Sequence, residues 1–180
     1  MAPQAFDSKQ IALGITGGIA AYKACDVIRE LYRQGAHQVI PMLSPSAKAF
    51  ITPLTLESLS RHRVIESDLE TTDDGTPTHI ALAQQCDGLL ILPATANTLA
   101  KLAHGLADNI ITTTALTFTD KPVVVAPAMN TRMWFNPATQ RNLSLLASYG
   151  HIDVIPPDAG LLACGETGPG KLASLDLILL

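Results

Sequence analysis

Aromatic side chains and clustered positive charge are scarce in this chain of 180 residues. Phenylalanine, tryptophan and tyrosine together make up 4% of the residues, too few for a surface that stacks nucleic-acid bases. The formal net charge is -4 at pH 7, and the lysines and arginines are scattered rather than gathered in a basic stripe. These absences disfavour nucleic acids and anionic membranes as partners and leave small molecules as the expected ones.

Cysteine is also rare, and long apolar runs are missing. The three cysteines, Cys25, Cys86 and Cys164, have long and irregular spacings, which fit neither a disulfide framework nor a zinc site. No apolar run approaches the roughly 18 residues of a membrane-spanning helix, and the opening segment lacks the pattern of a signal peptide. We therefore expect a soluble protein without a metal site, located in a reducing cytoplasm.

Apolar residues make up 47% of the chain, enough for one substantial core, so we expect a single domain over residues 1–180. Short apolar segments alternate with helix-like segments. Strands are predicted at about 10–16, 37–43, 88–94, 121–128 and 151–157. The runs LLIL and VVV lack polar alternation, as in strands buried on both faces. The pattern predicts an α/β fold, a Rossmann-like or flavodoxin-like three-layer sandwich with a mainly parallel sheet.

A helix is predicted after the first strand, from about Ile19 to Gln34, with Gly35 as its stop. Its apolar face holds Ala24, Val27, Ile28 and Leu31. This face is expected to lie against the sheet. The acidic and turn-rich segment 66–78 is expected to be an exposed loop.

A glycine-rich turn, GITGGIAAYK, joins the first predicted strand to this helix. Gly14, Gly17 and Gly18 lie where a backbone can curl around an anion, and Thr16 adds a hydroxyl donor. The spacing matches neither the dinucleotide fingerprint nor the Walker sequence, so a mononucleotide such as FMN is favoured over NAD and ATP. A tight strand-to-helix connection without a ligand is the alternative.

Two further strand ends carry small or hydroxylated residues. One holds Ala94, Thr95, Ala96, Asn97 and Thr98, and the other holds Ser44, Ser46 and Lys48. Ligands in open α/β sheets bind beyond the carboxyl ends of strands, so these segments are candidates for one shared cofactor site. Ordinary helix capping is the competing interpretation.

Asn130 stands between two methionines beyond the VVV strand. Its amide suits the binding of a carboxylate without adding charge, and a turn is the alternative role. Met129, Met133 and Trp134 are expected to pack in the core. His79 begins a predicted helix, where a capping or surface role competes with a role in proton exchange.

Cys164 lies in the glycine-rich segment LLACGETGPGKL. The flexibility of this segment suits a flap over a site, and a thiol on such a flap can act as proton donor or nucleophile. A small apolar residue in a turn is the alternative. Cys25, on the apolar side of a helix, and Cys86, just before a strand, are expected to be core residues.

The segments GITGGIAAYK, THIALA, LPATANTLAKLAHGLADN, PAMNTRMW and ACGETGPGK together resemble the homo-oligomeric flavin-containing cysteine decarboxylases, over about residues 11–171. The last two segments in combination are highly specific, whereas the glycine turn is common to many flavoproteins. The resemblance implies FMN bound between subunits. The expected cofactor-binding residues are Thr16, Gly17, Gly18, Ser44, Ala94, Thr95, Ala96, Asn97 and Thr98. The implied catalytic residues are His79, Asn130 and Cys164, and the substrate-binding residues are Asn130, Met129 and Lys171.

The implied reaction converts 4'-phosphopantothenoylcysteine into 4'-phosphopantetheine in coenzyme A biosynthesis. Oxidation of the thiol to a thioaldehyde provides an electron sink for carbon dioxide release, and Cys164 takes part in returning hydride and proton to the enethiolate. Asn130 would orient the carboxylate, and His79 would assist the oxidative decarboxylation. The family also implies a homo-oligomer, a trimer or a dodecamer, and a decarboxylase domain to which bifunctional members add a C-terminal ligase domain absent from this chain.

Three alternatives to this interpretation remain. A peptidyl-cysteine decarboxylase would act on a peptide, but such relatives lack the same cysteine flap. A flavin prenyltransferase has a similar fold without the His79 and PAMN pattern. A non-catalytic FMN-binding regulatory subunit is expected to lack His79, Asn130 or Cys164, all of which are present.

Overall fold

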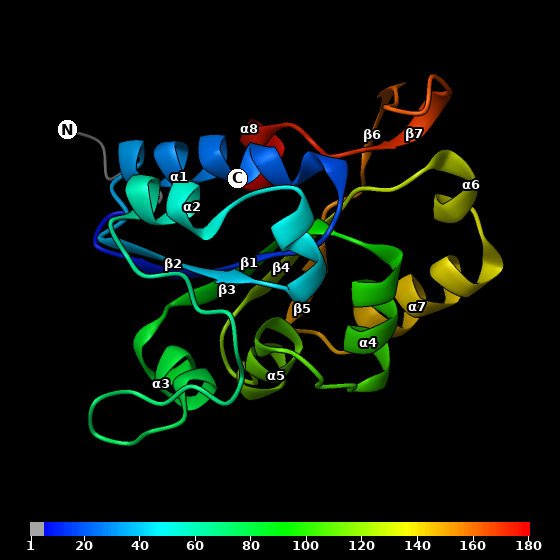
Figure 1. Ribbon diagram of the computed structural model, residues 1–180. Helices are drawn as coiled ribbons and strands as arrows, with labels where there is room; N and C mark the ends of the chain where they lie inside the picture. Colours follow the sequence, from blue (N-terminus) through cyan, green and yellow to red (C-terminus); the bar gives the residue numbers. More distant parts are fainter. Residues whose placement is uncertain (1–5) are drawn as a thin grey trace.

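The computed structural model describes residues 6–180, and its centre is a sheet of five parallel strands (Figure 1). The strands are β1 (Gln10–Ile15), β2 (Gln38–Leu43), β3 (Gly88–Ala94), β4 (Val123–Pro127) and β5 (Ile152–Val154). Their order is β2-β1-β3-β4-β5, the doubly wound order of flavodoxin-like folds. The predicted α/β fold is confirmed, and each strand lies within its predicted segment.

Helices cover both faces of the sheet and complete the three layers (Figure 1). One face packs against the 3-10 helix η1 (Ile19–Lys23) and the helices α1 (Ala24–Arg33), α2 (Pro53–Ser60) and α8 (Leu175–Ile178). The other packs against α3 (Thr78–Gln85), α4 (Ala96–His104), α5 (Ile110–Thr117) and α7 (Pro137–Ala147). Every residue of β3 is buried, because the strand is covered on both sides.

The helix predicted after the first strand is divided into two parts. Its first turn is the 3-10 helix η1, and regular α-helix begins at Ala24. The predicted apolar face is confirmed, since Ala24, Val27, Ile28 and Leu31 are fully buried. Gly35 follows the helix with φ 93°, a left-handed conformation that glycine adopts at low cost. The segment 66–78 is confirmed as a loop, although Thr78 is buried and begins α3.

An antiparallel hairpin of β6 (Asp158–Leu161) and β7 (Thr167–Lys171) stands outside the main sheet. Figure 1 shows it beside the short helix α6 (Thr131–Trp134), at the end of the molecule to which the carboxyl ends of the central strands point. The glycine-rich segment predicted as a flap forms the tip and second strand of this hairpin. None of the helices between residues 6 and 180 has the length and hydrophobicity needed to span a bilayer.

Candidate active site

A cavity of about 450 Å³ opens beyond the carboxyl ends of β1, β3 and β4. Its wall comes from the glycine turn after β1, the turn between β3 and α4, the segment after β4, and the hairpin. Of the predicted site residues, the cavity brings together Gly17, Gly18, Thr95, Ala96, Met129, Asn130, Cys164 and Lys171. Segments far apart in the sequence therefore meet at the edge of the sheet where open α/β folds bind ligands.

Short helices begin at three neighbouring strand ends at this edge. η1 follows β1, η2 (Pro45–Ala49) follows β2, and α4 follows β3. Gly18, before η1, has no side chain that could cap the helix, and the Ser44 side chain makes no capping hydrogen bond to η2, whose first residue, Pro45, has no N–H. Backbone N–H groups left free at a helix start attract anions, so this edge suits a phosphate group.

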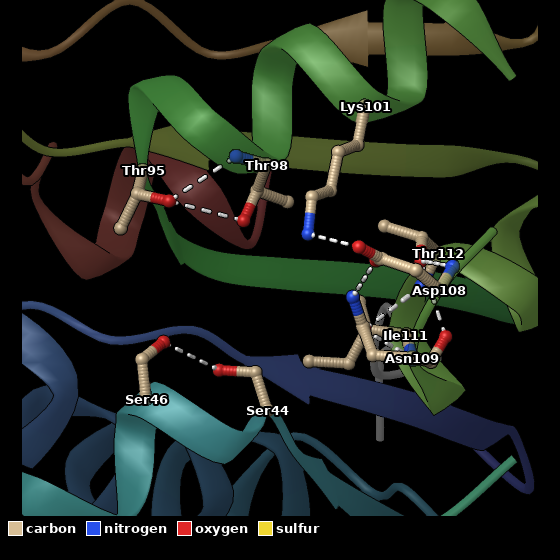
Figure 2. Close-up of polar contacts among 9 residues, drawn as sticks. All are labelled: Ser44, Ser46, Thr95, Thr98, Lys101, Asp108, Asn109, Ile111 and Thr112. Carbon is tan, nitrogen blue, oxygen red and sulfur yellow. Dashed lines mark hydrogen bonds and ion pairs between the residues drawn. The ribbon is translucent and has the colours of Figure 1, made fainter. Parts of the chain in front are cut away.

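The turn after β1 lies directly against η2. A Cβ atom on Gly17 would come within 2.6 Å of Ser46 Cβ and 2.8 Å of the Ser46 carbonyl carbon, so only glycine fits. The Ser44 and Ser46 hydroxyl oxygens are 3.3 Å apart, and those of Thr95 and Thr98 are 3.1 Å apart. Figure 2 shows the two hydroxyl pairs, each joined by a dashed line, with Thr95 and Thr98 at the start of α4 above Ser44 and Ser46. This arrangement of close-packed backbone and hydroxyl groups fits the phosphate end of a mononucleotide.

The Thr16 hydroxyl makes two hydrogen bonds within the protein. It donates a hydrogen bond to the Pro93 carbonyl and accepts one from the Thr95 N–H at 3.2 Å. In this structure the hydroxyl joins the end of β1 to the end of β3, and its predicted contact with the cofactor stays a prediction. Ala94 is fully buried, and Asn97 is exposed on the first turn of α4.

Helix capping explains part of the hydroxyl pattern. Thr95 caps α4 by accepting a hydrogen bond from the Thr98 N–H at 3.2 Å. Asn109 caps α5 in the same way, and Lys101 of α4 pairs with the neighbouring Asp108 at 2.6 Å (Figure 2). The capping interpretation is therefore confirmed for Thr95, whereas Ser44 and Ser46 bond to each other rather than to a helix N-terminus.

Asn130 is the centre of a polar cluster between β4 and the hairpin. Its Oδ1 accepts a hydrogen bond from the Arg132 N–H at 2.8 Å, which caps α6. Its Nδ2 donates to Glu166 Oε2 at 2.8 Å and to Cys164 Sγ at 3.3 Å. Arg132 Nη2 lies 3.1 Å from the other Glu166 oxygen. The amide orientation is fixed by these contacts, with its NH2 group facing the hairpin tip.

Backbone contacts hold the base of the hairpin against the same segment. The Met129 N–H donates to the Gly170 carbonyl at 2.9 Å, and the Thr131 hydroxyl donates to the Pro169 carbonyl at 2.8 Å. Gly170 has φ 141°, and a Cβ atom there would overlap the Met129 carbonyl oxygen. Glycine is needed at this position because only a residue without a side chain allows this close approach.

His79 does not line the cavity. It is the second residue of α3, and Figure 1 shows α3 beside α5, away from α6 and the hairpin. Its Nδ1 atom is buried and has no hydrogen-bond partner among residues 6–180. A single chain therefore does not bring His79 together with Asn130 and Cys164.

The three cysteines differ in their surroundings. Cys164 is exposed and lines the cavity. Cys86 is fully buried, and burial raises the pKa of its thiol to about 12, so it stays protonated at neutral pH. Cys25 is half-buried, and burial also raises its pKa. The predicted packing role of Cys86 is confirmed, and Cys164 is the one of the three thiols that lines the cavity.

Some residues of the site were missed or misjudged from the sequence. Glu166 and Arg132 were not singled out, although both belong to motifs that carry the family resemblance. They lie beside Asn130 and not in the cavity lining, whereas Lys23, the last residue of the GITGGIAAYK segment, lines the cavity. The predicted core role of Met133 is wrong, because its side chain is 47% exposed and lines the cavity.

Comparison with known proteins identifies one matching family and several relatives of similar sequence. A family model described as Flavoprotein matches residues 2–179. The chain is 47% identical over 173 residues to a probable phosphopantothenoylcysteine decarboxylase of Streptococcus mutans, with 96% of each chain covered. It is 43% identical over 169 residues to the coenzyme A biosynthesis bifunctional protein CoaBC of Vibrio vulnificus (strain YJ016), covering 94% of this chain and 41% of that protein. The chain thus spans less than half of the bifunctional relative.

Solved structures that superpose on this chain include decarboxylases. A cysteine-to-serine mutant of phosphopantothenoylcysteine decarboxylase, complexed with pantothenoylaminoethenethiol, superposes with a TM-score of 0.85 at 33% identity, covering 96% of this chain and 94% of that one. The FMN-dependent cysteine decarboxylase SpaF superposes with a TM-score of 0.83 at 30% identity, covering 97% of both chains.

Proposed function

The chain belongs to the flavoprotein family, and we propose that it is an enzyme that uses FMN to decarboxylate 4'-phosphopantothenoylcysteine to 4'-phosphopantetheine. The observation that carries this proposal is that the glycine turn, Asn130 and Cys164 line the same cavity. A carboxylate-binding amide, a thiol and an anion-binding turn are the groups that this substrate and cofactor require. Release of carbon dioxide from the purified protein tests the proposal.

The edge of the sheet fits FMN. Gly17, Gly18 and Ser44 surround the phosphate end in this proposal, and the β3–α4 turn with Thr95 supplies a second wall. The cavity is lined largely by apolar side chains beyond these turns, as a flavin ring and a pantetheine arm require. When bound, FMN would take two electrons from the substrate thiol, giving a thioaldehyde that is the electron sink for loss of carbon dioxide, and would return the two electrons after carbon dioxide has left.

The chain's own residues bind the substrate and move its protons in this proposal. Asn130 holds the carboxylate through its Nδ2 donors, and Met129 lines the site beside it. Cys164 delivers a proton to the enethiolate left after carbon dioxide has gone. Lys171 on β7 lines the same cavity and provides a positive charge for the substrate phosphate.

We propose that a second copy of the chain completes the site. His79 lies away from the cavity within one chain, so its catalytic role requires that another subunit bring it there. Exposed apolar side chains near the cavity support association of copies: Ile19, Tyr22, Met133, Phe135 and Leu161. The proposed homo-oligomer is a trimer or a dodecamer. We also propose a cytoplasmic location, which the free state of all three cysteines supports.

Mixed oligomers test the shared site. His79→Ala and Asn130→Ala proteins are each expected to be nearly inactive alone. Co-expressed with different tags and purified as mixed oligomers, they should recover roughly a quarter of the wild-type rate, because one interface in four then combines two intact residues. Oligomers of proven mixed composition that stay inactive would show that the two residues do not come from different subunits.

Replacement of Cys164 by serine is expected to separate the two halves of the reaction. Under anaerobic conditions the variant should release about one carbon dioxide per site and then stop, because a serine hydroxyl is a far weaker acid than a thiol. The measurement compares carbon dioxide with 4'-phosphopantetheine by mass spectrometry, and an enethiol should accumulate. Cys25→Ser, whose residue lies outside the cavity, is the matched control. Wild-type yields of 4'-phosphopantetheine from Cys164→Ser would remove this thiol from the mechanism.

A further inference from the structure

The carboxylate of Glu166 lies against the residue proposed to bind the carboxylate of the substrate. One of its oxygens accepts a hydrogen bond from Asn130 Nδ2 at 2.8 Å, and the other lies 3.1 Å from Arg132 Nη2. A neutral amide and a guanidinium thus hold the two oxygens of a single carboxylate. This donor pair has the chemistry of a carboxylate-binding site, and here a side chain of the protein fills it.

We propose that Asn130 and Arg132 together form the subsite for the substrate carboxylate, and that Glu166 occupies this subsite until the substrate displaces it. The inference rests on the decarboxylase function proposed above. It adds Arg132 as a substrate-binding residue and gives Glu166 the role of an internal competitor.

The Asn130 amide is held in the orientation that this role requires. Its Oδ1 accepts the N–H of Arg132 at 2.8 Å and so caps α6. Its Nδ2 hydrogens therefore point to the hairpin tip whether or not Glu166 is present. The same hydrogen bond fixes the backbone of Arg132, the second residue of α6, and so fixes the point from which the Arg132 side chain extends.

Glu166 can leave the subsite without loss of the hairpin. The hairpin base is held by the Met129–Gly170 and Thr131–Pro169 hydrogen bonds, neither of which involves Glu166. The Arg132 side chain is 86% exposed and that of Glu166 is 40% exposed, so water screens their ion pair and exchange costs little. A rotation of the Glu166 side chain frees both donors for an incoming carboxylate.

The exchange keeps both donors paired before and after the reaction. A substrate that carries a carboxylate replaces one anion by another, so the charges of Arg132 and the incoming group remain paired. Once carbon dioxide has left, the product has no carboxylate to hold the subsite, and Glu166 returns to it. The Asn130–Arg132 subsite itself favours substrate over product, and Glu166 lowers this preference because it competes with the substrate carboxylate but not with the product.

The test compares two ligands on the FMN-loaded protein by calorimetry. One is 4'-phosphopantothenoylserine, the hydroxyl analogue that keeps the carboxylate, and the other is 4'-phosphopantetheine, which lacks it. The measured quantity is the Kd of the product divided by the Kd of the analogue. Arg132→Met should lower this ratio by about threefold. Glu166→Ala should raise it by about threefold or more, and the isosteric Glu166→Gln should raise it less, because the glutamine amide still accepts from Asn130 but no longer pairs with Arg132.

A loosened hairpin would raise the Kd of both ligands by a similar factor. The ratio of the two Kd values is therefore insensitive to such a general loss of affinity. Arg141→Met, an exposed arginine of α7 outside the cavity, is the matched control and should leave the ratio unchanged. An unchanged ratio in Arg132→Met, or a lowered ratio in Glu166→Ala, would overturn the inference. Carbon dioxide release by the wild-type protein is measured in parallel. If the wild-type protein turns over and Arg132→Met leaves the ratio unchanged, only the proposed subsite is overturned. If the wild-type protein does not turn over, the proposed decarboxylase function is overturned as well.

Discussion

Replacement of Asn130 by alanine is expected to lower kcat/KM for 4'-phosphopantothenoylcysteine by about a thousandfold, or about 4 kcal/mol, while the protein keeps its FMN. The loss arises because the substrate carboxylate is no longer held in the orientation needed for its departure. The glycine turn and the β3–α4 turn, which are proposed to hold FMN, make no hydrogen bond to the Asn130 side chain. Steady-state kinetics and the flavin absorption of the purified variant measure the two effects.

Alanine at this position also removes the cap of α6, which is expected to cost about 1 kcal/mol of folding stability. Asn130→Asp separates the two roles, because a carboxylate oxygen still accepts the Arg132 N–H that the Oδ1 atom accepts now. The aspartate variant should keep the cap of α6 and yet lose turnover, since it has no N–H donor and its charge repels both the Glu166 carboxylate, which now accepts from Asn130, and the substrate carboxylate. Turnover within about tenfold of wild type in both variants would remove Asn130 from the mechanism.

Replacement of Gly17 by valine is expected to weaken FMN binding by at least about a hundredfold and to give a colourless protein. The new side chain would collide with the Ser46 side chain and backbone and push the β1–η1 turn away from η2. The proposed phosphate site lies beside this contact, with the β3–α4 turn as its second wall. Titration of the apoprotein with FMN, followed by flavin fluorescence, measures the change in Kd.

Gly18→Ala is the matched comparison for this variant. A Cβ atom there has no neighbour closer than 4.0 Å, so the turn keeps its shape and the loss of FMN affinity should be much smaller. Thermal unfolding of both apoproteins shows how far the collision at Gly17 also destabilises the fold. FMN affinity equal to wild type in Gly17→Val would contradict the placement of the phosphate at this turn.

The fold could be predicted from the sequence because its signals are local. Short runs without polar alternation, such as LLIL and VVV, are typical of strands covered on both faces, and β3 is buried along its whole length. The face formed by Ala24, Val27, Ile28 and Leu31 followed from helical spacing alone. The 3-10 form of the first helical turn could not be predicted from this spacing, because it depends on how the chain leaves the glycine turn.

The candidate site could be predicted in its parts but not in its contacts. The glycine turn, Asn130 and Cys164 were recognised from local motifs, and the structure places all of them at one cavity. The contact between Glu166 and Asn130 joins residues 36 positions apart in the sequence, so no local pattern reveals it. The contact of the Thr16 hydroxyl with the Pro93 carbonyl likewise joins residues 77 positions apart.

His79 was recognised from the sequence, but the structure of one chain does not place it at the site. Its motif identified it as a candidate, but the single chain places it away from the cavity, with its Nδ1 buried and unpaired among the described residues. A side chain that acts across a subunit boundary cannot be located from the fold of one subunit. The mixed-oligomer experiment is therefore the direct test of its role.

The most direct measurement of the central claim is carbon dioxide release from 4'-phosphopantothenoylcysteine by the purified protein, with its absorption spectrum recorded alongside. The account predicts a yellow protein that releases carbon dioxide and forms 4'-phosphopantetheine in equal amounts. A yellow protein that binds FMN but forms no 4'-phosphopantetheine would contradict the proposed reaction and favour a different cysteine substrate or a non-catalytic flavoprotein.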